Sequence, residues 1–228
     1  MKLYMDKSKP VHGYEEGRVD AVDPETSGKA LAYKNDFLKH FIPIDQRQIE
    51  TRLAGGRFYV TRKYDGEYAM IVCDRGTTVT INRSGRVRRG IPCIEEAGRL
   101  IAAAGIREGM FGAEIYAEKD GRRGRLKGLL AALADKKRIG TLRLAVYDIV
   151  ELDGKPWRGR FNETWEKLHE VFGHGELIRE VDMEVAKNPQ QVSRIYEKWV
   201  VGEKSEGVVV RGDHRTTVAQ FTPPLESA

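Results

Sequence analysis

Strand-like segments that follow one another directly along the chain are the feature that most limits the fold. Residues 56–63, 67–74 and 77–85 are rich in Tyr, Val, Ile and Thr, and no helical segment separates them. Consecutive strands with short connections pair antiparallel, whereas a doubly wound parallel sheet needs strict strand–helix alternation. The sequence therefore predicts an α+β fold of antiparallel sheets flanked by helices.

The remaining segments fit this fold class. Residues 1–30 are polar and contain several Pro and Gly residues, so we expect an irregular lead-in there. Apolar periodicity and turn signals predict the other elements. Further strands are expected at 109–118, 142–152, 205–212 and 215–221, and helices at 43–56, 93–105, 126–138, 162–173 and 188–202.

Composition excludes several classes of function. The chain has 228 residues, 40% of them hydrophobic, and a net charge of +5, which suits a globular protein. Two cysteines without a CxxC pair and scattered histidines argue against a disulfide framework or a structural zinc site. No signal peptide, membrane span, GxGxxG fingerprint or Walker-type loop is present, so we expect a cytoplasmic protein.

Basic residues are clustered rather than spread evenly. The clusters favour a polyanionic partner such as nucleic acid, and solvated loops and helix faces are the alternative. Their members are Arg83, Arg86, Arg88, Arg89, Lys119, Arg122, Arg123, Arg125, Lys127, Lys136, Lys137 and Arg138.

A lysine interrupts the first pair of strands, in the stretch "VTRKYDGEYAMIVCD". Lys63 could simply point to solvent, because an ammonium is costly to bury. Alternatively, a lysine whose pKa is lowered presents a neutral amine that can attack an electrophile. Gly66 would let backbone or ligand approach closely.

Acidic and aromatic residues in other strands favour the second interpretation. Glu114, Tyr147 and Glu206 each interrupt or precede an apolar strand, and each alone could be an ordinary strand-edge or core residue. Together with Lys63 they place one amine, carboxylates and an aromatic ring on strands that we expect to converge in one cleft.

Five motifs carry a family resemblance: "KYDG", "NRSG", "FGAEI", "YDIVELDG" and "EGVVVR", in this order. The series resembles the nucleotidyltransferase motifs of ATP-dependent polynucleotide ligases, and DNA ligases most of all. The resemblance covers about residues 59–211. It implies a nucleotidyltransferase (ATP-grasp-like) fold, with residues 1–56 as a lead-in packed on the core and residues 57–228 as the adenylation domain.

The resemblance also implies roles for individual residues. Lys63 would attack the α-phosphorus of ATP and form a covalent lysyl–AMP, which passes AMP to a 5′-phosphate end. Tyr147 would stack on adenine, and Glu206 with Asp65 would hold Mg²⁺. The implied nucleotide-binding residues are Arg62, Lys63, Arg83, Glu114, Tyr147 and Glu206.

The implied partner is nucleic acid, with nicked DNA favoured over RNA. Arg86, Arg88, Arg89, Arg122, Arg123 and Arg125 are assigned to its binding. We expect a monomer without a membrane contact, and a separate OB-fold or DNA-binding partner, because the chain has no OB-fold domain of its own. An RNA ligase and a catalytically impaired nucleic-acid-binding module are the alternatives.

Two departures from the family pattern bear on activity. Tyr68 stands where the family has an arginine in Lys-x-Asp-Gly-x-Arg. The closing Lys-x-Lys motif is missing, since its positions fall near Ala219 or Gln220 and Thr222. Loss of such a charge clamp weakens transition-state stabilisation. Candidate substitutes are Lys204, Arg211 and Arg215.

Overall fold

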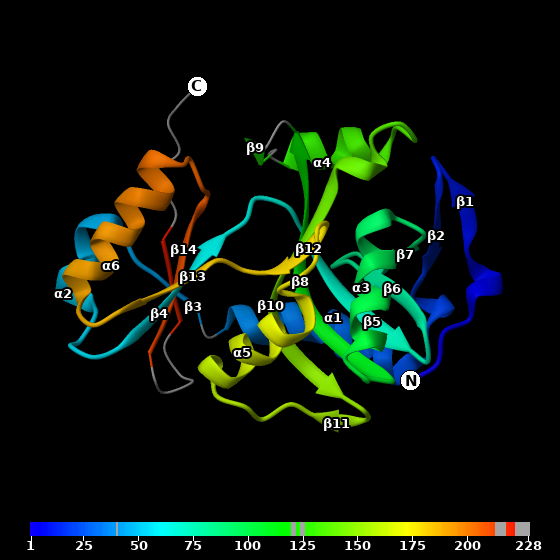
Figure 1. Ribbon diagram of the computed structural model, residues 1–228, viewed down its shortest axis with the longest axis horizontal. Coiled ribbons are helices and arrows are strands. Elements are labelled where there is room, and N and C mark those ends of the chain that lie inside the picture. The colour runs from blue at the N-terminus through cyan, green and yellow to red at the C-terminus, as the bar shows by residue number, and fades with distance from the viewer. Residues whose placement is uncertain (40, 120–121, 124–125, 213–217, 222–228) are drawn as a thin grey trace. The chain divides into compact units, whose positions relative to one another are not determined.

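The chain forms two compact units, each assembled from separate segments. The computed structural model describes residues 1–39, 41–119, 122–123, 126–212 and 218–221 (Figure 1). Unit 1 comprises residues 1–36, 65–158 and 164–180, and unit 2 comprises residues 37–64, 159–163 and 181–228. The predicted boundary between residues 56 and 57 differs from this division, because residues 1–36 belong to unit 1 and residues 37–56 to unit 2.

Unit 1 is built on a large sheet. Among the described residues, ten strands form it in the order β1-β2-β7-β6-β5-β8-β10-β11, with β12 added beside β10 and β9 beside β8. All pairs are antiparallel except β10 with β12. The strands are β1 (Lys9–Val11), β2 (Tyr14–Arg18), β5 (Glu67–Asp74), β6 (Thr77–Ile81), β7 (Arg86–Arg89), β8 (Glu108–Lys119), β9 (Arg122–Arg123), β10 (Leu142–Leu152), β11 (Lys155–Pro156) and β12 (Ile178–Glu180).

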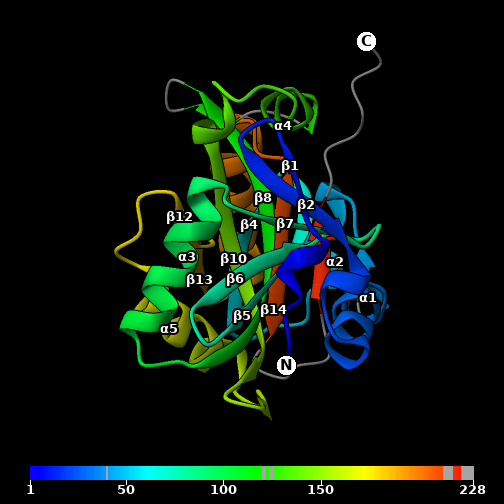
Figure 2. The ribbon, with the colours of Figure 1, turned by 90° about the vertical axis from the view of Figure 1, so that its right-hand side faces the viewer.

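Both faces of this sheet are covered. Successive side chains of a strand point to opposite faces, so β5 sends Ile71 into one core and Met70 into the other. Helices α3 (Pro92–Ala103), α4 (Leu126–Leu133) and α5 (Phe161–Phe172) pack on the first face. Helix α1 (Pro24–Leu38) packs on the second, opposite α3 and α5 (Figure 2).

Unit 2 has a smaller sheet with the strand order β13-β4-β14-β15-β3 among the described residues. Helices α2 and α6 pack against each other beside this sheet (Figure 1). Asn188 caps α6 and Pro189 occupies its first turn. The elements are β3 (Phe41–Pro43), α2 (Ile49–Arg52), β4 (Phe58–Lys63), β13 (Met183–Ala186), α6 (Pro189–Tyr196), a π-helical turn (Glu197–Gly202), β14 (Gly207–Gly212) and β15 (Val218–Phe221).

The prediction of an α+β fold with antiparallel sheets is confirmed, but the prediction of an irregular lead-in is wrong. Residues 1–30 contain β1, β2 and the first half of α1. Asp23 accepts a hydrogen bond of 3.0 Å from the backbone N–H of Thr26, which caps a helix that begins at Pro24. Proline and glycine here mark a helix start and a hairpin rather than an irregular segment. In the described part of the chain, no helix has both the length and the apolar character needed to cross a membrane.

Candidate active site

Lys63 is the last residue of β4 and pairs with Gly207 at the start of β14. Glu206 directly precedes Gly207, so the ladder between the two strands brings its carboxylate beside the lysine. The Lys63 Nζ and Glu206 Oε1 atoms form an ion pair. The two side chains are 23% and 31% exposed, which leaves them accessible to a ligand.

Arg62, the neighbour of Lys63, points into unit 2. Its Nε and Nη2 atoms each lie 2.7 Å from a carboxylate, of Asp182 and Glu203 respectively, and its Nη1 donates to Ser205 Oγ at 2.7 Å. The guanidinium also lies over the ring of Trp199. The side chain is only 6% exposed. Arg62 therefore ties the segment before Glu206 to the strand that carries Lys63, and its assignment to nucleotide binding stays a prediction.

Gly66 sits where only a glycine fits. A Cβ atom at this position would lie 2.2 Å from the backbone oxygen of Ile115 and 3.0 Å from Cγ of Glu114. The glycine of "KYDG" thus lets the chain run against β8, beside Glu114. This close approach accounts for the glycine of the motif, whereas the expectation that the strands on either side pair with each other is wrong, since β4 and β5 belong to different sheets.

Glu114 shares one face of the unit 1 sheet with a group of tyrosines. It pairs with Tyr68 of β5 and Ala145 of β10. Burial, and then the charge of Glu114, raise the pKa of Tyr68, whose hydroxyl donates a 2.8 Å hydrogen bond to the carbonyl of Ala30. The tyrosine that replaces the expected arginine is thus a core residue that contacts α1.

Tyr147 lies at an irregularity of β10. The register with β8 shifts between Val146 and Asp148, as in a β-bulge, and Tyr147 lies between them. A Cβ atom on Gly112 would lie 3.0 Å from the Tyr147 ring and 3.2 Å from the hydroxyl of Tyr33. Gly112 therefore leaves room for two aromatic side chains over the sheet.

Arg83 and Asp65 also belong to unit 1. Arg83 is exposed, and its Nη2 lies 3.5 Å from Oδ1 of Asn35. Asp65 is half-buried in the segment between Lys63 and β5. Among the described residues, no group of three or more His, Cys, Asp or Glu side chains could hold a metal ion. A Mg²⁺ ion needs fewer protein ligands, since it is often held by one or two carboxylates and substrate phosphates.

The arginines predicted to contact nucleic acid differ in their ion pairs and in the exposure of their side chains. Arg86 and Arg88 pair with Glu16, Arg88 also pairs with Glu67, and Arg89 pairs with Glu15. The Arg88 side chain is 5% exposed, whereas that of Arg86 is 46% exposed. Arg122 and Arg123 form β9. Arg125 lies outside the described residues.

The strand expected to carry the Lys-x-Lys motif is present as β15, although the structure describes only part of the motif. Ala219 and Gln220 belong to β15, which pairs with β14. Thr222 and Arg215 lie outside the described residues. Arg211 is buried, donates to Thr61 Oγ1 at 3.0 Å and lies over the Phe161 ring.

The candidate site residues fall into both units. Lys63, Arg62 and Glu206 belong to unit 2, and Asp65, Arg83, Glu114 and Tyr147 to unit 1. The expectation that they converge around one ligand stays a prediction. Sequence reasoning missed Asp182 and Glu203, which form ion pairs with Arg62, because no local pattern links them to a partner more than 100 residues away.

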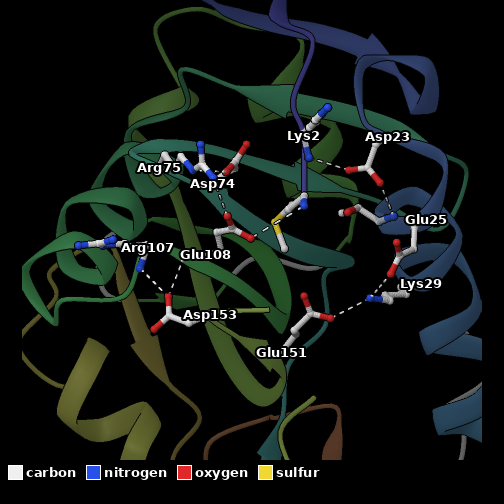
Figure 3. Close-up of polar contacts among 12 residues, drawn as sticks. Lys2, Asp23, Glu25, Lys29, Asp74, Arg75, Arg107, Glu108, Glu151 and Asp153 are labelled. Carbon is white, nitrogen blue, oxygen red and sulfur yellow. Dashed lines mark hydrogen bonds and ion pairs between the residues drawn. The ribbon is translucent and has the colours of Figure 1, made fainter. Parts of the chain in front are cut away.

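A separate hollow lies elsewhere on unit 1. It has a volume of about 870 Å³ and is lined by Arg75, Gly105, Arg107, Glu108 and Asp153. Figure 3 shows the pairing of Arg75 with Glu108 and of Asp153 with the Arg107 backbone. Glu114 lies six positions beyond Glu108 in β8, or about 20 Å along the strand. The hollow is therefore distinct from the candidate site.

Comparisons with solved structures agree with this architecture. A structure titled "Pmar-Lig_PreS3" matches with a TM-score of 0.61 and 13% identity over 86% of this chain and 51% of its own. The ATP-dependent DNA ligase of bacteriophage T7 in complex with ATP matches with a TM-score of 0.53 and 14% identity, over 82% of this chain and 68% of its own. A Lig E DNA ligase described as a minimal scaffold matches with a TM-score of 0.53 and 12% identity, over 75% and 64%.

These likenesses concern the fold. The chain spans about half the length of the first two structures that it matches. No curated protein matches it. The family model described as the ATP dependent DNA ligase domain matches residues 41–218, which is well over half of the chain. With its motif series, its antiparallel sheets and this match, the chain belongs to the ATP-dependent DNA ligase domain family.

Proposed function

We propose that this chain forms a covalent lysyl–AMP at Lys63 and transfers AMP to the 5′-phosphate of a nick in DNA. The observation that carries the proposal is the position of Lys63, at the end of β4, partly exposed and beside the carboxylate of Glu206. The family match and the order of the five motifs support it. We also propose a cytoplasmic role in DNA repair or replication, which such an activity would serve.

The first step is attack of the Lys63 amine on the α-phosphorus of ATP. The amine gives up its proton to water, a P–N bond forms, and the P–O bond to the departing pyrophosphate breaks. In the second step an oxygen of the 5′-phosphate attacks the same phosphorus and the P–N bond breaks, which regenerates the lysine. Attack of the 3′-hydroxyl on the adenylated end then releases AMP and seals the strand.

Residues of unit 1 would bind the nucleotide in this scheme. Tyr147 offers an aromatic face to adenine, Glu114 contacts the ribose, and Arg83 contacts the nucleotide and the phosphate-bearing end. Chain connectivity supports the role of Glu114 beside Lys63. Lys63 is three residues from Gly66, and Gly66 packs against Glu114. Three residues span at most about 11 Å, whatever the arrangement of the two units.

Mg²⁺ suits this site chemically. Glu206 and Asp65 supply carboxylate oxygens, which a hard cation prefers, and ATP supplies the remaining oxygens. The ion would offset the negative charge of the phosphates. Glu206 also contacts Lys63, so one carboxylate lies beside both the nucleophile and the proposed ion.

Exposed basic residues would bind the nucleic acid, together with a separate OB-fold or DNA-binding partner. Among the predicted contacts we favour Arg86 over Arg88, because the Arg88 charge is buried against two carboxylates. A catalytically impaired binding module is the second candidate, and the missing Lys-x-Lys motif favours it.

Labelling separates these two candidates. The protein is incubated with α-labelled ATP and Mg²⁺, denatured, and tested for bound label. We expect label on the wild type and none on Lys63→Ala, whereas Lys155→Ala, at an exposed hairpin lysine, should keep it. An unlabelled wild type would favour the binding module.

Substrate choice needs a second assay. Nick sealing is compared on DNA and on RNA duplexes, and we expect DNA to be sealed faster. Faster sealing of RNA would support the RNA ligase alternative. Binding to nicked DNA should weaken steeply as salt rises, because phosphate contacts release counterions.

A further inference from the structure

Three neighbouring residues on one face of helix α1 bind the unit 1 sheet through an ion pair and two hydrogen bonds. Lys29 forms a 2.8 Å ion pair with Glu151 of β10 (Figure 3). The Ala30 carbonyl accepts the hydrogen bond from Tyr68, and the Tyr33 hydroxyl donates to Oδ2 of Asp148 at 2.5 Å. Positions 29, 30 and 33 lie on one side of a helix. The contact with Glu151, followed by that with Glu25, raises the pKa of Lys29 above its ordinary value.

Tyr33 reaches the irregular part of β10. Asp148, its partner, follows Tyr147, and its other carboxylate oxygen accepts a 2.9 Å hydrogen bond from the Ile149 N–H. The Tyr33 ring also stacks on Tyr68, with centroids 6.2 Å apart and planes at 14°. Both Tyr33 and Tyr147 pack over Gly112. Tyr33 therefore contacts Asp148 directly and shares the Gly112 surface with Tyr147.

A bulge leaves a residue unpaired and disrupts the ladder locally, so its shape depends more on contacts from outside the strand pair. In β10 one such contact is the hydrogen bond of Tyr33 with Asp148. If it is lost, the Tyr147 ring keeps its chemical character but loses its fixed orientation. A base-stacking residue with a free orientation binds its ligand more weakly, because ordering it costs entropy.

We propose that Tyr33 is a positioning residue for the nucleotide base, acting through Asp148 on Tyr147. This inference rests on the proposed function, in which Tyr147 stacks on adenine. Tyr33 and the whole of α1 precede the region matched by the family model, which begins at residue 41. The family description therefore assigns nothing to this helix.

The test compares Tyr33→Phe, which removes only the hydroxyl, with Tyr4→Phe, which removes a hydroxyl from an exposed tyrosine. Lysyl–AMP formation is measured over a range of ATP concentrations. We expect Tyr33→Phe to raise the ATP concentration for half-maximal rate about tenfold, with a small change in the maximal rate, as for loss of one hydrogen bond to a charged group. Tyr4→Phe should match the wild type.

Hydrogen exchange of residues 145–149 gives a measurement that needs no activity. The amides should exchange faster in Tyr33→Phe than in the wild type and Tyr4→Phe, while those of β5 stay unchanged. Unchanged exchange in this segment, or an unchanged ATP dependence, would overturn the proposal. An unlabelled wild type with faster exchange in Tyr33→Phe would instead count against the proposed function and leave the positioning by Tyr33 supported.

Discussion

The Nε atom of Arg62 donates a 2.7 Å hydrogen bond to Oδ2 of Asp182, joining the strand that carries Lys63 to the segment before β13. We predict that Arg62→Met lowers the free energy of unfolding by about 2 kcal/mol, since hydrogen bonds to charged groups each contribute about 1.5–3 kcal/mol and the half-exposed carboxylates can be hydrated again. Urea denaturation measures the change.

Arg57→Met is the matched control for this prediction. Arg57 is exposed and lies over the ring of Tyr59. Its substitution should change stability by less than about 0.5 kcal/mol. Equal losses in the two variants would show that the buried hydrogen bonds of Arg62 contribute nothing particular to stability.

Gly66→Ala should destabilise unit 1. The added Cβ would lie 2.2 Å from a backbone oxygen of β8, so either the strand or the segment after Lys63 must move. We expect a loss of about 1–3 kcal/mol and slower lysyl–AMP formation. Gly55→Ala, where no atom lies within 4 Å of the added Cβ, should leave both quantities close to wild type.

Gly28→Ala should have the opposite effect on stability. Gly28 lies inside α1, and an added Cβ would meet no atom within 4 Å. Alanine loses less backbone entropy than glycine when a helix forms, so we expect a gain of about 0.5–1 kcal/mol. A thermal melt measures this, and a lower melting temperature would contradict the location of this residue in a helix.

Cys93 should be unreactive in the folded protein. Burial raises the pKa of its thiol to about 12, from an ordinary value of 9.0. The thiolate is the reactive form, so a maleimide at pH 8 should label this residue only after unfolding in urea. Since the pKa is higher in the folded state, this group should make stability decrease as the pH rises from about 9 to about 12. Rapid labelling of native Cys73→Ala would contradict the burial of Cys93.

Much of the fold could be predicted because local patterns agreed with it. The run of Tyr, Ile and Val in residues 67–74 corresponds to β5, and the apolar periodicity of residues 188–202 corresponds to α6 and the π-helical turn after it. Helix α1 could not be predicted in this way. Its apolar residues are few, and it is held by contacts of Lys29, Ala30 and Tyr33 with strands more than 35 residues away.

The types of the candidate site residues could be predicted, but the contacts that hold these residues in place could not. Lys63 and Glu206 could be chosen because each stands at one end of an apolar strand in a recognisable motif. The structure adds their direct contact, which depends on the register of β4 with β14. The burial of Arg62 and Arg88 could not be predicted, because it depends on carboxylates from other elements.

Helix α1 has a practical consequence for anyone who shortens this protein to its recognised family region. A fragment that starts at Phe41 would lose the cover over Tyr68, Met70, Val72 and Met110, which are all buried beside Ala30. Such a fragment would expose an apolar sheet face to water, and self-association of that face would reduce its solubility. The smallest piece that can be purified intact should therefore begin well before the family boundary.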